Sequence, residues 1–413
     1  MHDSMPFEPG SEHGGRPMSA ASLPLEGVTV VSLEQAVAAP FATRQLADLG
    51  ARVIKVERPG DGDFARRYDE TVHGQSSHFV WLNRSKDSVT LDVKTPGGRE
   101  VLERLLSGAD VFVQNLAPGA AARLGLSAEE LNERHPSLIV CDISGYGADG
   151  PWAGRKAYDL LVQCETGVVS VTGTPEQPAK VGIAIADIAA GMYAYSGILT
   201  ALYERRATGV ARAVSVSLFE ALAEWMGYPA YYTAHSGTQP RRVGAAHATI
   251  APYGPYDATD GRTVLLAIQN EREWASFCAE FLDDPALAAD PRFHRNSSRV
   301  ARRAELDAVV TARFAELTAA EATALLDRAK VANARLNTVA DFLDHPVLSG
   351  RDRWRDVPTP AGPIRALVPP ASLSGVEPRM EAVPDVGEHT EAVLKELGYE
   401  ASAIEALREE GAL

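Results

Sequence analysis

The sequence is poor in cysteine and has no excess of positive charge. Its three cysteines, Cys141, Cys164 and Cys278, are too widely spaced for a disulfide framework or a CxxC pair, which is typical of a reducing compartment. The net charge is -15, and no local basic stripe offsets it. Nucleic-acid phosphates and anionic lipid surfaces would therefore be repelled. We expect a cytoplasmic protein that binds neither nucleic acid nor membrane.

Long apolar segments are also scarce. Only residues 181–203 approach the roughly 20 residues that a membrane span needs, and they include Asp187. We interpret this segment as a buried core helix. Residues 1–22 are polar, rich in Gly, Pro and Ser, and lack the apolar stretch of a signal peptide. We expect them to form a disordered tail in which His2 and His13 are solvated.

Several common catalytic motifs are missing, namely GxxxxGK[ST], HExxH and GxSxG. The run from Gly145 to Gly150 fits GxGxxG formally, but PWAGRKAYD follows it in place of an apolar helix. A tight loop is the better interpretation. Asp61 and Asp63, in PGDGDF, indicate a turn, because no further ligands follow at calcium-loop spacing. We expect no metal site.

The hydrophobic pattern predicts a regular alternation of strands and helices. The 413 residues, 45% of them hydrophobic, are enough for two domains. Strands are predicted at residues 28–34, 51–57, 109–116 and 137–144, and helices at 38–50, 95–109 and 127–136. Strand, helix and strand in succession form parallel βαβ units. The fold class is therefore α/β, with a doubly wound, Rossmann-like parallel sheet.

The character of the sequence changes beyond Phe219. We expect a large α/β domain at 23–224 and a smaller α+β domain at 225–335, which opens with aromatic, loop-rich sequence and contains a strand at 262–269. Residues 336–413 include a Pro-rich extended part and a final helix at 390–399. We expect this C-terminal segment to return to the large domain.

Two acids each precede an apolar helical pattern. Asp187 has a structural interpretation as the N-cap of a helix that ends with Arg205 and Arg206 before Gly209. The same position, shielded from water, would make its carboxylate a nucleophile. Asp159 stands in a similar relation to the sequence after it. Both acids could converge at the C-terminal edge of a parallel sheet, where α/β proteins bind ligands.

Six ordered stretches together cover almost the whole chain after the tail. They are PLEGVTVVSLEQAVAAPFATRQLADLGARVIKVERPGDGDFAR, LDVKTPGG, VQNLAPGAAARLGL, GYGADGPWAGRKAYDLLVQ, IADIAAGMYAYSGIL and DVGEHTEAVLKELGY. These stretches resemble the type III CoA-transferases (CaiB/BaiF), which include formyl-CoA transferase, carnitine CoA-transferase and alpha-methylacyl-CoA racemase.

The resemblance implies a role for each matching residue. Asp187 would attack an acyl-CoA thioester and carry the acyl group and then CoA, with Asp159 supporting it through hydrogen bonds. The residues implied to contact CoA are Gln35, Ala36 and Ala38 at the thioester and pantetheine, and Arg58, Leu91, Lys94, Asn115, Arg123 and Lys156 near the nucleotide end. Coenzyme A would enter as a co-substrate thioester, with no permanently bound cofactor, and the family implies an interlocked homodimer.

The chain also departs from the pattern of the family that it resembles. Val37 replaces a glutamine of formyl-CoA transferase, so oxyanion stabilisation is assigned to backbone amides. Tyr158 replaces a histidine of the racemase branch, and its phenol has too high a reference pKa, about 10, for that role. This favours a transferase over a racemase, the alternative function. His247, in residues 244–254, either contacts the acceptor acid or is a loop histidine.

The substrate is predicted only as a class. Residues 158–196 resemble the branch that handles short dicarboxylates, with succinyl-CoA or a similar thioester as donor. A second carboxylate on the acceptor would need a cation or hydrogen-bond donor. We expect it from Arg241, Arg242 or His247.

Overall fold

A computed structural model describes residues 23–413, so the predicted tail lies outside the described residues. The chain separates into two compact units. One contains residues 23–33, 43–112 and 355–413, and the other contains residues 34–42 and 113–354. These bounds differ from the domain bounds expected from composition, which stay a prediction.

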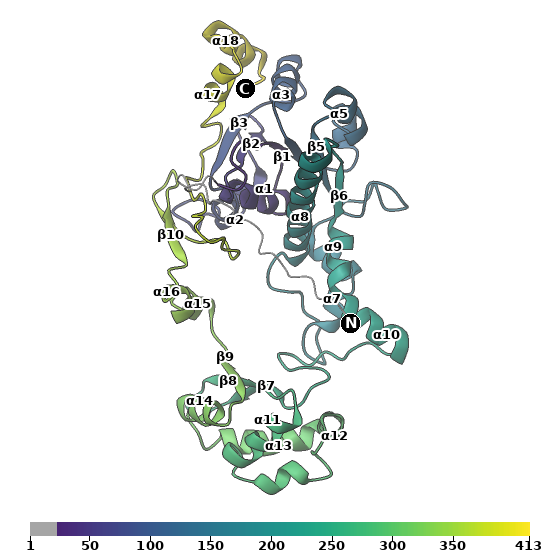
Figure 1. Cartoon of the computed structure of the whole chain (residues 1–413), viewed down its shortest axis with the longest axis vertical. Helices are drawn as coiled ribbons and strands as arrows, with labels where there is room; N and C mark the ends of the chain where they lie inside the picture. Colours follow the sequence, from purple (N-terminus) through teal and green to yellow (C-terminus); the bar gives the residue numbers. More distant parts are fainter. Residues whose placement is uncertain (1–22) are drawn as a thin grey trace, which may run out of the picture. The chain divides into compact units, whose positions relative to one another are not determined.

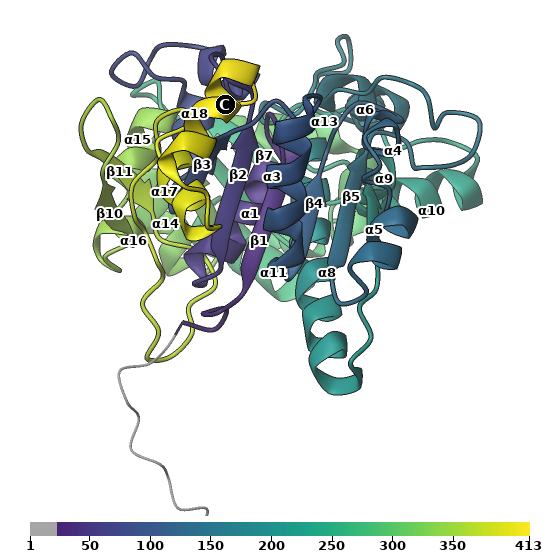
Figure 2. The same cartoon turned by 90° about the horizontal axis from the view of Figure 1, so that it is seen from above.

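The first unit contains three parallel strands, β1 (Thr29–Leu33), β2 (Arg52–Glu57) and β3 (Lys86–Thr90). Helix α3 (Pro96–Ser107) begins with the Thr95 hydroxyl accepting the Gly98 N–H and with proline at its first position, as its sequence predicts. The C-terminal helices α17 (Thr390–Glu396) and α18 (Ala401–Glu410) pack against β3 and α3 (Figure 2). The end of the chain is thus part of the unit that contains β1–β3.

In the second unit, β5 (Ile139–Ser144) and β6 (Val214–Ser217) pair in parallel. Helix α5 (Ala128–Arg134) packs against β5 and begins with a capping box formed by Ser127 and Glu130. Helix α8 (Ile185–Thr208) packs against both strands and against α6 (Asp159–Glu165) and α9 (Leu218–Trp225). It ends where predicted, with Gly209 in the left-handed conformation.

The parallel strands form one six-stranded sheet in the order β3-β2-β1-β4-β5-β6, with β4 at Val111–Gln114. The predicted doubly wound parallel sheet is confirmed. Sequence reasoning did not predict β3 and β6, because KDSVT and VSVS are short and rich in polar residues. The predicted loop at residues 145–150 is confirmed, since no helix follows β5 before Asp159.

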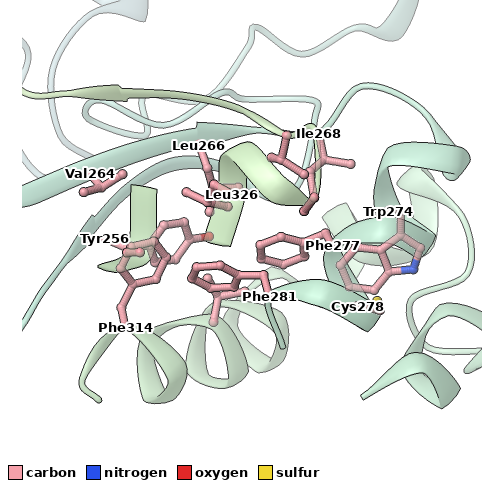
Figure 3. Close-up of a cluster of buried hydrophobic side chains, with 14 of the residues drawn as sticks. Tyr256, Val264, Leu266, Ile268, Trp274, Phe277, Cys278, Phe281, Phe314 and Leu326 are labelled. Atoms are coloured by element: carbon pink, nitrogen blue, oxygen red, sulfur yellow. The ribbon is translucent and has the colours of Figure 1, made fainter. Parts of the chain in front are cut away.

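A separate antiparallel sheet has the order β7-β8-β9, formed by Tyr253–Asp257, Thr263–Ala267 and Ala332–Arg335. Helices α11 (Glu271–Glu280), α13 (Arg303–Phe314) and α14 (Ala319–Arg328) contribute to its core. Figure 3 shows the aromatic centre of this core, where the rings of Phe277 and Phe281 stack 5.0 Å apart. This confirms the expected small α+β region, including its strand at 262–269.

The remaining elements complete the described part of the chain and are labelled in the figures where there is room (Figure 1). They are α1 (Ala38–Asp48), η1 (Phe64–Arg67), α2 (Ser77–Leu82), α4 (Ala120–Arg123), α7 (Val168–Val171), α10 (Gly227–Ser236), η2 (Pro285–Ala289), α12 (Asn296–Ala301), α15 (Val339–Leu343), α16 (Pro346–Ser349), β10 (Trp354–Val357) and β11 (Ile364–Leu367). The expectation of loop after residue 225 is wrong at α10. Its proline, Pro229, lies in the first turn, where no helical hydrogen bond is lost.

Among the described residues, one helix, α8, is long and apolar enough by composition to cross a membrane, with a mean hydropathy of 1.3 over its best window. It packs against β5, β6, α6 and α9, and 39% of that window is buried. The acid Asp187 in its first turn also argues against a span.

Candidate active site

Asp187 lies inside the first turn of α8. The helix begins at Ile185 with Ala184 at the N-cap position, so Asp187 is the third helical residue. The interpretation of Asp187 as the N-cap is therefore wrong. An acid in the first helical turn is still favoured by the helix dipole. Its side chain is partly buried and is free of the capping task that an N-cap aspartate would have.

The cap of α8 comes from Asp159 on another helix. The Oδ1 atom of Asp159 accepts the backbone N–H of Ala186 at 2.7 Å and, at 3.4 Å, that of Asp187. Asp159 is the first residue of α6, and Tyr158 occupies the N-cap position of that helix. The two predicted acids are thus brought together. The sequence suggested convergence but not that one acid would cap the helix of the other.

A glutamine missed by sequence reasoning completes this contact. Gln163 is fully buried, one helical turn after Asp159. Its Nε2 atom donates to Asp159 Oδ2 at 2.7 Å and lies 3.4 Å from the carbonyl oxygen of Ile183. Its Oε1 atom accepts the N–H of Val181 at 2.9 Å. The i, i+4 spacing of Asp159 and Gln163 was the signal available in the sequence.

The environment of Asp187 disfavours its charged form. Burial, and secondly the nearby negative charge of Asp159, raise the pKa of Asp187 to about 7. An ordinary aspartate has a pKa near 3.9. The carboxyl group is therefore partly ionised near neutral pH, and its ionised form is poorly solvated. A carboxylate in this state is a candidate nucleophile or general base.

The crossover between β1 and α1 is held by Asn115, which directly follows β4. Asn115 Oδ1 accepts the N–H of Gln35 at 2.9 Å, and Asn115 Nδ2 donates to the Gln35 carbonyl at 2.8 Å. The next residue, Ala36, has φ of 62°, a left-handed conformation that is strained for alanine. The Asn115 amide thus fixes a strained loop. Its predicted contact with the nucleotide end of CoA stays a prediction.

Helix α8 approaches this crossover one turn after Asp187. A Cβ atom added at Gly191 would lie 2.7 Å from the carbonyl oxygen of Ala38 and 3.0 Å from the ring of Phe41. Only glycine fits there without displacing the start of α1. Because residues i and i+4 share a helix face, Asp187 and Gly191 face the same side of α8. The first turn of α1, entered through Val37 and Ala38, therefore borders the face that carries Asp187.

In the first unit, Arg58 and Leu91 follow the carboxyl ends of the paired strands β2 and β3. Leu91 is buried, and its N–H donates to the Glu57 carbonyl at 2.9 Å. Arg58 and Lys94 are exposed. The structure therefore places these three predicted CoA contacts at one edge of β2 and β3, the edge at which parallel sheets bind ligands.

The turn after Arg58 rests on a buried ionic cluster. Lys55, inside β2, pairs with Asp63 at 2.8 Å, and both side chains are almost completely buried. Glu57 accepts two hydrogen bonds from Arg66, one from Ser88 and one from the Asp63 N–H. Burial opposes the charged form of Glu57, but the Arg66 hydrogen bonds and the nearby charge of Lys55 hold its pKa at about 2. Asp63 also caps η1. Its interpretation as a turn residue was incomplete, because it anchors the turn to the sheet.

The remaining predicted residues are more exposed. Arg123 ends α4, while Lys156 lies in the loop before α6 and Tyr158 is 67% exposed. The His247 ring stacks on Tyr253 at 5.2 Å, and its Nδ1 atom accepts the Thr249 N–H at 3.2 Å. This contact leaves Nε2 as the protonated nitrogen of a neutral imidazole.

Arg242 has a structural task. Its guanidinium donates to the carbonyl oxygens of Ser170, Thr174 and Pro175 at 2.9–3.1 Å. It therefore fastens the segment after α10 to the loop after α7. Arg241 is exposed and is the better candidate for a substrate cation. Within residues 23–413, no group of three or more His, Cys, Asp or Glu side chains is arranged to hold a metal ion.

Comparisons with known proteins agree on one family. The model of CoA-transferase family III matches residues 25–390. Succinyl-CoA:glutarate CoA-transferase of Mus musculus is 35% identical over 95% of this chain and 91% of its own length. Succinyl-CoA–D-citramalate CoA-transferase of Chloroflexus aurantiacus is 31% identical over 91% of this chain and 94% of its own length.

A solved structure of the same family has a similar fold. The crystal structure of a CAIB/BAIF family protein from Brucella suis superposes with a TM-score of 0.81 at 35% identity. It covers 91% of this chain and 100% of the Brucella chain. The chain therefore belongs to CoA-transferase family III and is an enzyme of the CoA-transferase class.

Proposed function

We propose that this CoA-transferase moves CoA from succinyl-CoA, or a similar acyl-CoA, to a short dicarboxylic acid, with Asp187 as a covalent carrier. The observation that carries the proposal is the carboxyl group of Asp187, poorly solvated in the first turn of α8 with its pKa raised to about 7. Its backbone is fixed by Asp159. This is a side chain prepared for nucleophilic attack.

The first half of the reaction loads the enzyme. One carboxylate oxygen of Asp187 attacks the thioester carbonyl, the C–S bond breaks, and an acyl-aspartyl anhydride and CoA thiolate form. The thiolate then attacks the aspartyl carbonyl of the anhydride. The donor acid leaves with one oxygen from Asp187, and an aspartyl-CoA thioester remains. Because each intermediate is an activated acyl group, no ATP is required.

The second half reverses these steps with the acceptor. A carboxylate oxygen of the incoming acid attacks the aspartyl-CoA carbonyl and expels CoA thiolate. The thiolate attacks the acceptor carbonyl of the new anhydride, which yields the new acyl-CoA and the free Asp187 carboxylate. Water must be excluded while these intermediates exist, since both are hydrolysable.

The backbone at the start of α1 is proposed to stabilise the oxyanions. The close approach of Gly191 to Ala38 supports this assignment, because it brings the first turn of α1 to the face of α8 that carries Asp187. The backbone N–H groups of Val37 and Ala38 point from a helix N-terminus, where the helix dipole favours negative charge. Residues 35–38 would also line the thioester and pantetheine.

The polyanionic end of CoA requires cations. Arg58, Lys94, Arg123 and Lys156 are exposed and available for phosphate binding, and we propose that they hold the nucleotide end together with Leu91. Binding there would add affinity at a distance from the reacting carbonyl. Such binding energy is used to orient the thioester against Asp187.

The acceptor class rests on the relatives, whose names specify glutarate and D-citramalate as acids that receive CoA. The free second carboxylate of such an acid would need a donor, for which we propose Arg241 or the Nε2–H of His247. We further propose a homodimer with active sites built from both chains. A cytoplasmic location is proposed because Cys141, Cys164 and Cys278 are all unpaired.

The test is to incubate the protein with succinyl-CoA and a panel of unlabelled mono- and dicarboxylic acids and to identify new CoA esters by mass spectrometry. We expect esters of short dicarboxylic acids and an equal amount of free succinate. Hydrolysis without new esters would contradict the proposal. Exchange of the substrate's alpha proton with deuterated water, without any acceptor acid, would also contradict it and would favour an isomerase.

A further inference from the structure

The contacts of Gln163 suggest a role in the reaction although it is fully buried. Its amide joins three points: the carboxylate of Asp159, the N–H of Val181 and the carbonyl of Ile183. These belong to α6 and to the segment that enters α8. Both ends of the amide are therefore used, and a side chain with only donors or only acceptors could not replace it.

We propose that Gln163 is a positioning residue for CoA transfer, which holds the Asp159 carboxylate on the first N–H groups of α8 and so sets the position of Asp187. This inference rests on the proposed function, in which Asp187 is the covalent carrier. The Asp159 carboxylate has two oxygens with separate tasks. Oδ1 caps α8 through Ala186 and Asp187, while Oδ2 is held by Gln163.

Without Gln163, Oδ2 would lose its protein donor, and the carboxylate could rotate away from α8. The first turn of α8 would then lose the side-chain cap that Asp159 provides, which Ala184 at the N-cap position cannot replace. Val181 would lose the acceptor of its N–H, so the segment that enters the helix would also shift. A displacement of the nucleophile by about 1 Å can reduce the rate on the order of 100-fold.

The elements that surround Gln163 carry several charged groups. They are Asp159 and Glu165 on α6, Lys180 before α8, Asp187 in the first turn of α8 with Glu204, Arg205 and Arg206 near its other end, and Glu220 and Glu224 on α9. Arg155 holds Glu165 at 3.0 Å, and Lys180 lies 3.4 Å from the Val181 carbonyl. Asp159 is the only one of them with a hydrogen bond to Gln163 among the described contacts.

The experiment compares Gln163→Met with Gln163→Glu. Methionine keeps the length but cannot donate, so we expect the kcat for CoA transfer to fall about 10- to 100-fold with little change in KM for the acyl-CoA. A protonated glutamic acid keeps one donor for Asp159 and one acceptor for the Val181 N–H, while it loses the second amide N–H that faces the Ile183 carbonyl. A neighbouring carboxylate raises its pKa. We therefore expect the ratio of the Gln163→Glu kcat to the wild-type kcat to rise as the pH falls from about 8 to about 6.

Val162→Ala is the matched control, because Val162 is buried on the same helix and has no polar contact with Asp159. It should lower the melting temperature while kcat changes by less than about twofold below the transition. Full kcat in Gln163→Met, or a pH-independent ratio in Gln163→Glu, would overturn the inference. If Gln163→Met does not fold, the pH dependence of the kcat ratio of Gln163→Glu to wild type tests the inference on its own.

The proposed function is tested alongside by Asp187→Asn. If that variant transfers CoA at the wild-type rate, the carrier assignment fails whatever Gln163 does. If Asp187→Asn is inactive and Gln163→Met is fully active, only the positioning role fails. The two failures are therefore distinguishable.

Discussion

Gly191 packs against Ala38 so closely that a Cβ atom at residue 191 would lie 2.7 Å from the Ala38 carbonyl oxygen. Gly191→Ala should therefore force α8 and the start of α1 apart. We expect a loss of about 1–3 kcal/mol in the free energy of unfolding, as for other overpacked sites. At temperatures where the variant is folded, its kcat should fall at least about tenfold, because Asp187 and the proposed oxyanion donors separate.

Gly182→Ala is a suitable control for this prediction, since a Cβ there meets no atom within 4 Å. It should keep nearly wild-type stability and kcat. Thermal melting and steady-state kinetics measure both quantities. A Gly191→Ala variant with unchanged kcat would show that the contact with Ala38 does not matter for the reaction.

Asn115→Asp tests the amide that holds the strained crossover. The carboxylate can still accept the Gln35 N–H, but its second oxygen would face the Gln35 carbonyl, which needs a donor. We expect a loss of about 1–3 kcal/mol in unfolding free energy and a lower kcat. If Asn115 contacts only the nucleotide end of CoA, KM for the acyl-CoA would rise instead with kcat unchanged.

The raised pKa of Asp187 predicts a pH-dependent rate. The carboxyl group must be ionised to attack, so the rate of enzyme acylation should rise with pH and level off above an apparent pKa of about 7. Rapid-mixing measurement of CoA thiolate release between about pH 5 and about pH 9 checks this. A midpoint near the ordinary aspartate value of about 3.9 would contradict it.

The raised pKa of Asp187 also predicts that this residue destabilises the folded protein at high pH. The folded state holds a proton on Asp187 more tightly than the unfolded state, so between about pH 4 and about pH 7 the free energy of unfolding falls as pH rises. Asp187→Asn removes this dependence. Because the group is partly exposed, we expect the variant to be more stable than wild type by only about 1–3 kcal/mol at pH 8, with the difference disappearing toward pH 4. If denaturant titrations gave Asp187→Asn and wild type the same free energy of unfolding at both pH values, the raised pKa of Asp187 would be contradicted.

The buried pair of Lys55 and Asp63 should be important for the turn after Arg58. Lys55→Met leaves the Asp63 carboxylate buried without this cation, which should cost about 3–5 kcal/mol, and Asp63→Asn added to it should recover part of the loss. Lys395→Met is the control, because the Lys395–Glu391 pair is exposed and should contribute less than about 1 kcal/mol. Equal effects of the two single substitutions would contradict the assigned importance of burial.

Much of the fold was predictable because local signals agreed with it. The strand and helix alternation, the Ser127 capping box, Pro96 at a helix start and Gly209 at a helix end all carry their information within a few residues. The strands β3 and β6 were missed because short, polar strands gain their stability from partners far away in the sequence.

The candidate site was predictable as a set of residue types but not as a geometry. Asp187 and Asp159 stood out as acids before apolar helices, yet the cap that joins them spans 27 residues of sequence. Gln163 was not noticed because two of its partners, Val181 and Ile183, become neighbours only when the segment that enters α8 packs against α6. The same holds for Asn115 and Gln35, which lie 80 residues apart.

Hydroxylamine trapping during turnover tests the carrier role of Asp187 most directly. Hydroxylamine added with succinyl-CoA attacks the aspartyl carbonyl of the anhydride or thioester and leaves a hydroxamate on the side chain. Digestion and tandem mass spectrometry should find that modification at Asp187, dependent on acyl-CoA and absent from Asp187→Asn. Continued CoA transfer with an unmodified Asp187, or a hydroxamate on another residue, would contradict the account.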